Sequence, residues 1–172
     1  MDGVAWAASA MIAARTRLEI AANNLANVST DGFRGSGARG FLNATGVVIE
    51  RTALEGRGAL RHTGRDSDRA IVGDGAFLLR DRNGGVVETR DGAFTRGTDG
   101  RLRDDAGRLL IGTRLERGSS VRSGFLESAN VDAIGEMVQM LAAERSFESA
   151  EKCVAAIDGV RQKAASDVAK AA

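Results

Sequence analysis

The uneven distribution of glycine is the feature that most constrains how this chain can fold. Of the 22 glycines in 172 residues, none lies in residues 4–28, and residues 125–170 hold only Gly135 and Gly159. Nearly all the others lie in residues 32–124. Glycine weakens the interior of a helix and favours turns. The sequence therefore predicts a helix at each end of the chain and a turn-rich β region between them.

The predicted N-terminal helix, residues 4–28, repeats apolar residues every seven positions. Its first row consists of Val4, Met11, Leu18 and Leu25. Its second row consists of Ala7, Ala14, Ala21 and Val28. This alternation of three and four residues is typical of a helix that packs lengthwise against a partner helix. Because the second row is mostly alanine, we expect the two helix backbones to approach closely.

The predicted C-terminal helix, roughly residues 131–169, repeats the same design. Its first row consists of Met140, Phe147, Val154 and Val168, and its second row of Ala143, Ala150, Ile157 and Ala164. A displaced apolar stripe at its start consists of Ile134, Val138 and Leu141. Asn130 or Ser128 is the predicted N-cap. Such helices form either a coiled-coil pair or an ordinary two-helix core, and the matching rows favour the coiled coil.

Short apolar segments between the helices indicate a small antiparallel sheet. The predicted strands lie at residues 70–72, 76–80, 85–89, 93–96 and 109–111. Asn-Gly and Asp-Gly pairs separate several of them, and these pairs are strong hairpin signals because both residues tolerate a positive φ. We expect four to six strands. The predicted fold class is therefore α+β, with long terminal helices that form a coiled-coil pair and a small β domain between them.

The sequence offers no assembled chemistry. His62 and Cys153 are the only residues of their kinds, so neither a metal site nor a disulfide has enough partners. We expect His62 at the surface and Cys153 as a small packing residue in the helix. The pair Asp104–Asp105 is expected to be solvated in a turn. We predict no catalytic, cofactor or metal site.

Two further functional classes find no support in the sequence. The run GSGARG at residues 35–40 matches a dinucleotide fingerprint, but a helix precedes it where a strand is required. A formal net charge of +1 gives no electrostatic reason to expect nucleic acid or an anionic membrane as a partner. No apolar run reaches the length of a membrane-spanning helix.

Three stretches resemble the flagellar rod and hook protein family. The run ANNLANVSTDGFR at residues 22–34 resembles the family's N-terminal signature. TGRDSDRAIVGDGAF at 63–77, with TRDGAF at 89–94 and DGRL at 99–102, resembles its central motif. GFLESANVD at 124–132, continuing to ERSFE at 144–148, is similar to its C-terminal signature. Within the family, the chain is most similar to the proximal rod group, with the distal rod group second.

The chain departs from the family pattern at a few positions. Asp31 replaces a usual proline, Ala76 a usual aromatic residue and Ala129 a usual serine. Members of the two rod groups also carry several dozen more β-domain residues between Gly112 and Gly124. We therefore expect the outer part of the β domain to be reduced.

The resemblance implies a structural subunit of the flagellar basal-body rod. In such proteins the terminal helices form a coiled coil that lines a hollow helical tube, and the tube transmits torque across the periplasm. The implied partners are other copies of the chain, other rod proteins and the flagellar type III export apparatus. Export would proceed from the cytoplasm, which agrees with the absence of a cleavable-signal pattern at the N-terminus. We expect no cofactor, no nucleic acid and no membrane insertion.

The expected division of the chain is a helix and signature at residues 1–34, a linker and small β domain at 35–124, and a helix at 125–172. The expected assembly interface consists of Val4, Met11, Leu18, Leu25, Asn23, Asn24, Asn27, Leu141, Phe147, Val154 and Ile157. Two alternatives remain open. One is a hook or other axial component. The other is a small ligand-binding or enzymatic β domain with dimerising helices, which would need a concave pocket lined by convergent polar groups.

Overall fold

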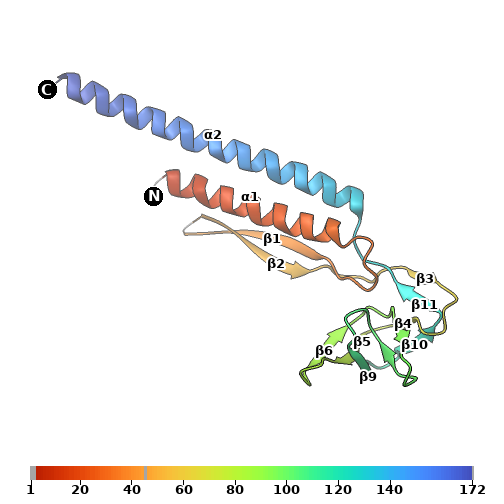
Figure 1. The fold of residues 1–172 in the computed structure, drawn as a ribbon. Helices are drawn as coiled ribbons and strands as arrows, with labels where there is room; N and C mark the ends of the chain where they lie inside the picture. Colours follow the sequence, from red (N-terminus) through yellow and green to blue (C-terminus); the bar gives the residue numbers. More distant parts are fainter. Residues whose placement is uncertain (1–2, 45, 172) are drawn as a thin grey trace. The chain divides into compact units, whose positions relative to one another are not determined.

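The computed structural model describes residues 3–44 and 46–171, and it places a helix at each end of the chain (Figure 1). The N-terminal helix α1 is Gly3–Ala26 and the C-terminal helix α2 is Ala133–Ala171. The strands between them are β1 Ser36–Asn43, β2 Gly46–Ala53, β3 Leu60–His62, β4 Arg69–Val72, β5 Gly75–Arg80, β6 Val86–Thr89, β7 Thr95–Arg96, β8 Leu102–Arg103, β9 Leu109–Leu115, β10 Ser120–Ser123 and β11 Phe125–Glu127. The predicted α+β class, with terminal helices flanking a small antiparallel β region, is confirmed.

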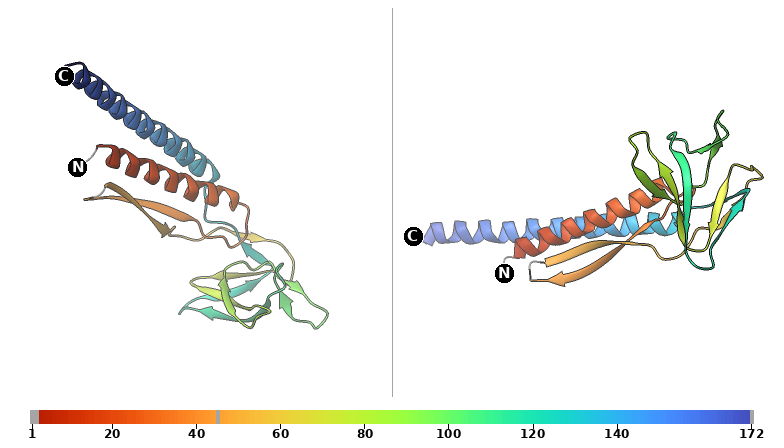
Figure 2. Two further views of the ribbon diagram at one scale, coloured as in Figure 1. Left: turned by 60° about the vertical axis from the view of Figure 1, so that its left-hand side comes forward. Right: turned by 90° about the horizontal axis from the view of Figure 1, so that it is seen from below.

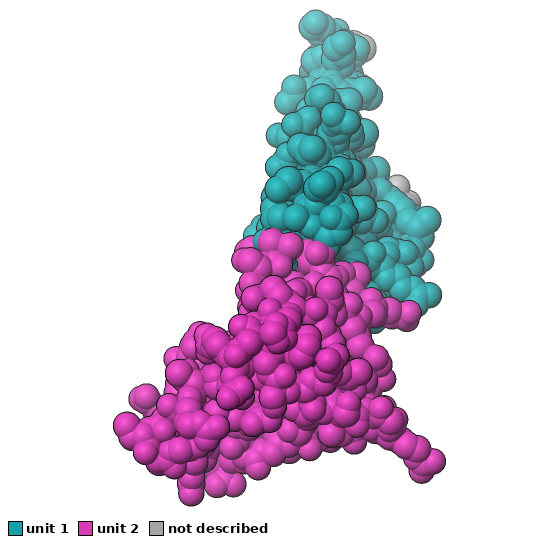
Figure 3. Space-filling model, turned by 90° about the vertical axis from the view of Figure 1, so that its right-hand side faces the viewer, with its two compact units in different colours: residues 1–25, 36–53, 132–172 teal, residues 26–35, 54–131 magenta. Residues whose placement is uncertain are grey.

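The chain divides into two compact units, and each is discontinuous in sequence (Figure 3). Unit 1 comprises residues 1–25, 36–53 and 132–172, and unit 2 comprises residues 26–35 and 54–131. Residues 36–53 thus belong to the same unit as the helices. The division drawn from the sequence had placed them in the linker and β domain at residues 35–124.

In unit 1, α1 and α2 lie side by side and run in opposite directions (Figures 1 and 2). Near one end of the pair, a methyl group built on Gly3 would lie 3.2 Å from Cδ1 of Ile157. At the other end, the Asn24 side chain donates a hydrogen bond of 2.8 Å to Glu136. The two helices therefore contact each other near both ends of α1.

The β1–β2 hairpin covers a second face of α1 (Figure 1). Ser9 Oγ accepts a hydrogen bond of 3.1 Å from the backbone N–H of Val47. The backbone at Gly46 passes so close to this serine that a Cβ there would overlap Ser9 Oγ, and its φ of +139° also favours glycine. Further along, the Arg17 guanidinium lies against Gly40. The heptad pattern of α1 gave no indication of this second partner.

Unit 2 is built around a five-stranded antiparallel sheet with the strand order β6-β5-β9-β8-β7. Two smaller pairs, β4 with β10 and β3 with β11, bring the C-terminal strands back to earlier ones. The core consists of Ile71, Phe77, Leu79 and Phe94. The two phenylalanine rings meet edge to face, with centroids 5.3 Å apart. The predicted strands all appear, although the segment at 93–96 shortens to β7.

Three local predictions are wrong. The N-cap of α2 is Asp132, whose carboxylate accepts hydrogen bonds from the N–H groups of Ile134 and Gly135. Cys153 is exposed and is not a packing residue within the chain. Asp104 is buried and not solvated, because its carboxylate accepts a 2.7 Å hydrogen bond from Arg108 Nε.

Candidate assembly surface

The predicted interface residues of α1 are only partly covered within the chain. Val4, Met11, Leu18 and Leu25 are all half-buried, whereas Ala14 and Ala21 of the alanine row are buried. Leu18 and Ala14 line an apolar groove of about 430 Å³ together with Ala143 and Phe147 of α2. The charged residues Arg15, Glu144 and Glu148 border this groove. The helix pair thus has alanine-rich contacts and leaves space beside its larger side chains.

On α2 the first two alanines of the second row are buried, and most of the large apolar residues are not. Ala143 and Ala150 are buried, and Val154 and Ile157 are half-buried. Leu141 and Phe147, by contrast, are exposed. The side chains that we expected to form the α2 side of the interface therefore divide between the α1 contact and open surface.

The displaced stripe at the start of α2 forms the clearest exposed apolar patch of unit 1. Ile134 is 73% exposed, Val138 and Leu141 are each 57% exposed, and Met137 beside them is 51% exposed. Val160 and Val168, in the part of α2 beyond its contact with Gly3, are 68% and 71% exposed. Apolar residues gathered on one face at helical spacing are typical of a surface that another protein covers.

The three predicted asparagines have different surroundings. Asn24 is fully buried, and its amide bonds both Ser36 and Glu136. Asn27, just past the end of α1, accepts a hydrogen bond from the Thr30 hydroxyl. Asn23 is exposed. Asn24 thus satisfies backbone groups of Ser36 from a buried position.

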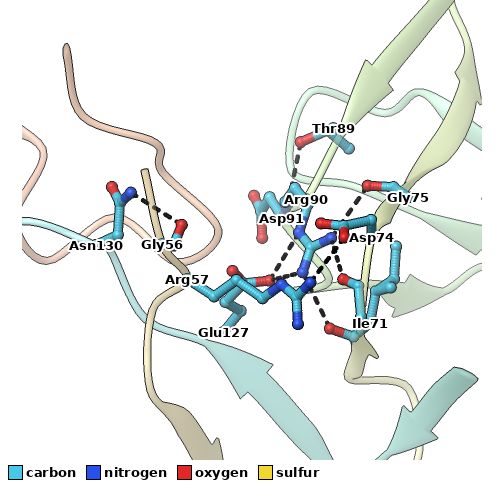
Figure 4. Close-up of polar contacts among 11 residues, drawn as sticks. Gly56, Arg57, Ile71, Asp74, Gly75, Thr89, Arg90, Asp91, Glu127 and Asn130 are labelled. Atoms are coloured by element: carbon cyan, nitrogen blue, oxygen red, sulfur yellow. Dashed lines mark hydrogen bonds and ion pairs between the residues drawn. The ribbon is translucent and has the colours of Figure 1, made fainter. Parts of the chain in front are cut away.

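Arg90 organises the polar centre of unit 2 (Figure 4). Its Nε donates to Glu127 over 2.8 Å, and Nη2 donates to the same carboxylate and to the carbonyl of Ile71. Nη1 donates to the carbonyls of Gly73 and Gly75 over 2.9 and 3.1 Å. All five guanidinium N–H groups thus have acceptors, which makes this buried ion pair fully hydrogen-bonded. Sequence analysis missed both residues, although each lies in a stretch that resembles a family motif.

A shallow hollow of about 420 Å³ lies beside this centre and is lined by Phe33, Ala76, Thr89 and Asp91, among others. Burial raises the pKa of the Asp91 carboxyl group. The hydrogen bond from the Ala93 N–H lowers this pKa, and the nearby negative charges of Asp31, Asp105 and Asp104 raise it further. The hollow holds no nucleophile paired with a base.

The described residues contain no group of three or more His, Cys, Asp or Glu side chains placed to hold a metal ion. Within the same residues, no helix combines the length and hydrophobicity needed to span a membrane. His62 lies at the surface, as predicted, with its ring edge against Phe125 at a centroid distance of 4.9 Å.

Two protein families match the ends of the chain. The family described as flagella basal body rod protein matches residues 6–34. The family described as flagellar basal body rod FlgEFG protein C-terminal matches residues 122–167. These matches cover most of α1 and α2, together with the segments that connect the helices to unit 2.

Curated relatives extend the similarity into the β region. The flagellar basal-body rod protein FlgF of Mesorhizobium japonicum is 36% identical over 64% of this chain and 49% of its own length. The flagellar hook protein FlgE of Brucella abortus is 30% identical over 80% of this chain and 37% of its own length. The flagellar basal-body rod protein FlgG of Bacillus subtilis is 25% identical over 87% of this chain and 92% of its own length.

The chain spans about half of the first of these relatives and less of the second. The matches fall on both helices and on the segments that join them, in one consistent order. The chain belongs to the flagellar basal-body rod and hook family, a family of structural axial proteins and not of enzymes.

Proposed function

We propose that this chain is a structural axial subunit of the flagellar basal-body rod. It polymerises with copies of itself and with other rod proteins into a hollow helical tube that transmits torque across the periplasm, after export from the cytoplasm by the flagellar export apparatus. One observation carries the proposal. The two ends of the chain, which match the family, meet as an antiparallel helix pair that leaves several large apolar side chains of α2 exposed.

The exposed side chains support assembly because a solitary chain leaves them in water. Burying the side chain of Ile134, Val138 or Leu141 is worth roughly 1.5–3 kcal/mol each. A neighbouring subunit that covers this stripe would thus gain a contact that no segment of the described chain makes. In a helical polymer every subunit repeats that contact.

Lengthwise pairing of α1 and α2 as a coiled coil is part of the proposal. The contacts at Gly3–Ile157 and Asn24–Glu136 are 21 residues apart on both helices, which supports a constant register between them. Buried Ala14, Ala21, Ala143 and Ala150 support a seam of small residues. The groove beside Leu18 leaves room for larger side chains of another subunit.

The test places one new carboxylate at either of two positions on α1. Leu18→Asp puts a charge into the apolar groove, with a cost of several kcal/mol for an unpaired buried carboxylate. Ala8→Asp puts the same charge at an exposed position of the same helix. Arg17 is less suitable as a control, because its guanidinium lies on Gly40 of the hairpin. We expect Leu18→Asp to abolish basal-body assembly and swimming, and Ala8→Asp to preserve both. Equal assembly of the two variants would contradict the proposed interface.

A hook or other axial position is the second candidate, because the hook protein of Brucella abortus is similar over 80% of this chain. Labelling of the protein in purified basal bodies with attached hooks separates the two, since label in the rod favours the first and label in the hook the second. A reduced outer β domain accompanies either candidate. The alignment with the Bacillus subtilis protein is 243 residues long, more than the 172 of this chain, so that relative holds residues that this chain lacks.

A further inference from the structure

The chain passes between its two units four times, after residues 25, 35, 53 and 131. Such passages are often flexible linkers rich in glycine or small polar residues. In this protein, hydrogen bonds hold the residues on both sides of most of the passages. Two buried or half-buried asparagine side chains, Asn24 in unit 1 and Asn130 in unit 2, make the largest share of these bonds.

On the unit 2 side, Asn130 joins three separate segments. Its Oδ1 accepts a hydrogen bond of 2.8 Å from the N–H of Gly35. Its Nδ2 donates to the carbonyls of Leu54 and Gly56 over 3.4 and 3.3 Å, and the second of these bonds is drawn in Figure 4. The Leu54 N–H donates in turn to the Gly35 carbonyl over 2.9 Å. The ends of three passages are thus tied to one side chain.

On the unit 1 side, Asn24 holds the next residue of the chain. Its Oδ1 accepts from the Ser36 N–H over 2.9 Å, and its Nδ2 donates to the Ser36 carbonyl over 2.7 Å. The same Nδ2 donates to Glu136 near the start of α2. Asn24 therefore pairs with Ser36 as a neighbouring strand would, while it also links α1 to α2.

We propose that Asn24 and Asn130 are a pair of clamps, one in each unit, and that each holds the chain segments that enter and leave its own unit. Gly35 and Ser36 are consecutive in the chain. Asn130 bonds the backbone of Gly35, and Asn24 bonds the backbone of Ser36. The role needs a carboxamide, because a single planar group must accept and donate at once. A carboxylate of the same shape keeps the acceptor and loses the donor.

The test uses hydrogen exchange on the isolated full-length chain. Asn130→Asp and Asn24→Asp keep the acceptor, remove the donor and add a negative charge, and Asn83→Asp makes the same change at an exposed turn of unit 2. We expect exchange at Leu54, whose N–H lies in the clamped segment, to accelerate about tenfold or more in Asn130→Asp. We expect the same at Ser36 in Asn24→Asp. Amides of Phe77 and Leu79 in β5 should stay within about twofold of wild type.

Two outcomes would overturn the clamps. Unchanged exchange at these two amides would show that the asparagines do not hold the passages. Equal acceleration in β5 would show a general loss of stability in place of a local clamp. Neither measurement requires a rod, so the clamps can fail while the protein still localises to basal bodies, and localisation can fail while the clamps are intact.

Discussion

Replacement of Arg90 by methionine should destabilise unit 2 more than the replacement of any other charged residue in it. Methionine keeps most of the apolar stem and removes the guanidinium that Glu127 and three backbone carbonyls share. Glu127 is 3% exposed, so its carboxylate would lose its counter-ion inside the protein. The variant therefore isolates the contribution of one side chain to the stability of unit 2.

The expected cost follows from two terms. Breaking a buried ion pair by removal of one partner costs about 3–5 kcal/mol. Each carbonyl left without a donor adds roughly 1 kcal/mol or more, unless water reaches it. A loss of about 5 kcal/mol or more is comparable with the whole stability of a small domain. Glu127→Gln should cost less, about 1.5–3 kcal/mol, because the amide oxygen still accepts from Arg90 and the carbonyls keep their donor.

The control is Arg114→Met, which removes an arginine from a 2.7 Å pair with Glu88 on the surface of the same unit. Both side chains of that pair are exposed, so the cost should stay below about 1 kcal/mol. The only tryptophan is Trp6 in unit 1, so its fluorescence does not report on unit 2. Hydrogen exchange of β5 amides at increasing urea is the suitable measurement. If Arg90→Met proves no more costly than Arg114→Met, the central role of Arg90 is refuted.

Three further predictions concern single positions. Burial raises the pKa of the Asp91 carboxyl group in the folded state above its unfolded-state value. The contribution of Asp91 to stability should therefore fall as the pH rises from the unfolded-state pKa through the folded-state pKa. In urea melts, the stability of Asp91→Asn should accordingly increase relative to wild type toward neutral pH. Asp132→Ala should cost about 1 kcal/mol and raise hydrogen exchange in the first turn of α2, and an unchanged first turn would argue against the cap. Gly92→Ala should cost about 1–3 kcal/mol or more, because its Cβ would overlap the Arg69 carbonyl oxygen, whereas Gly85→Ala, which meets nothing within 4 Å, should stay within about 0.5 kcal/mol by thermal melting.

The helices and the main strands could be predicted because their signals are local. Heptad spacing located α1 and α2 to within a few residues, and Asn-Gly and Asp-Gly turns marked the limits of β5, β6 and β7. Each of these elements carries its own pattern, and no distant partner is needed to recognise it.

The missed elements depend on partners far away in the sequence. Strands β3, β10 and β11 are three or four residues long, and each pairs with a segment about fifty residues or more distant. The β1–β2 hairpin is glycine-rich and lacks a strict alternation, because one of its faces covers the polar and small side chains of α1. Arg90 and Glu127 gave no signal of their own, since no local pattern shows that two charged residues will meet inside the protein.

The candidate surface was predicted only in outline for a similar reason. Periodicity identifies the face of a helix that is apolar, but not the number of partners that share it. In α1 the alanine row meets α2 while Ser9 and Arg17 meet the hairpin. In α2 the change of stripe near Leu141 was visible in the sequence, yet only the structure shows that the first part of that stripe faces solvent.

The insertion of unit 2 between the two helices affects how the helices find each other during folding. Roughly a hundred residues separate Ala26 from Ala133, and closing a loop of that length has a large entropic cost. Once unit 2 has folded, the hydrogen bond from Gly32 N–H to the Glu127 carbonyl and the one from Asn130 N–H to the Phe33 carbonyl hold the two ends of that loop together. The effective loop shrinks to roughly ten residues, which lowers the closure cost by on the order of 2 kcal/mol. Pairing of α1 with α2 then becomes nearly a local contact, so a refolding chain should complete its β domain first and its helix pair last.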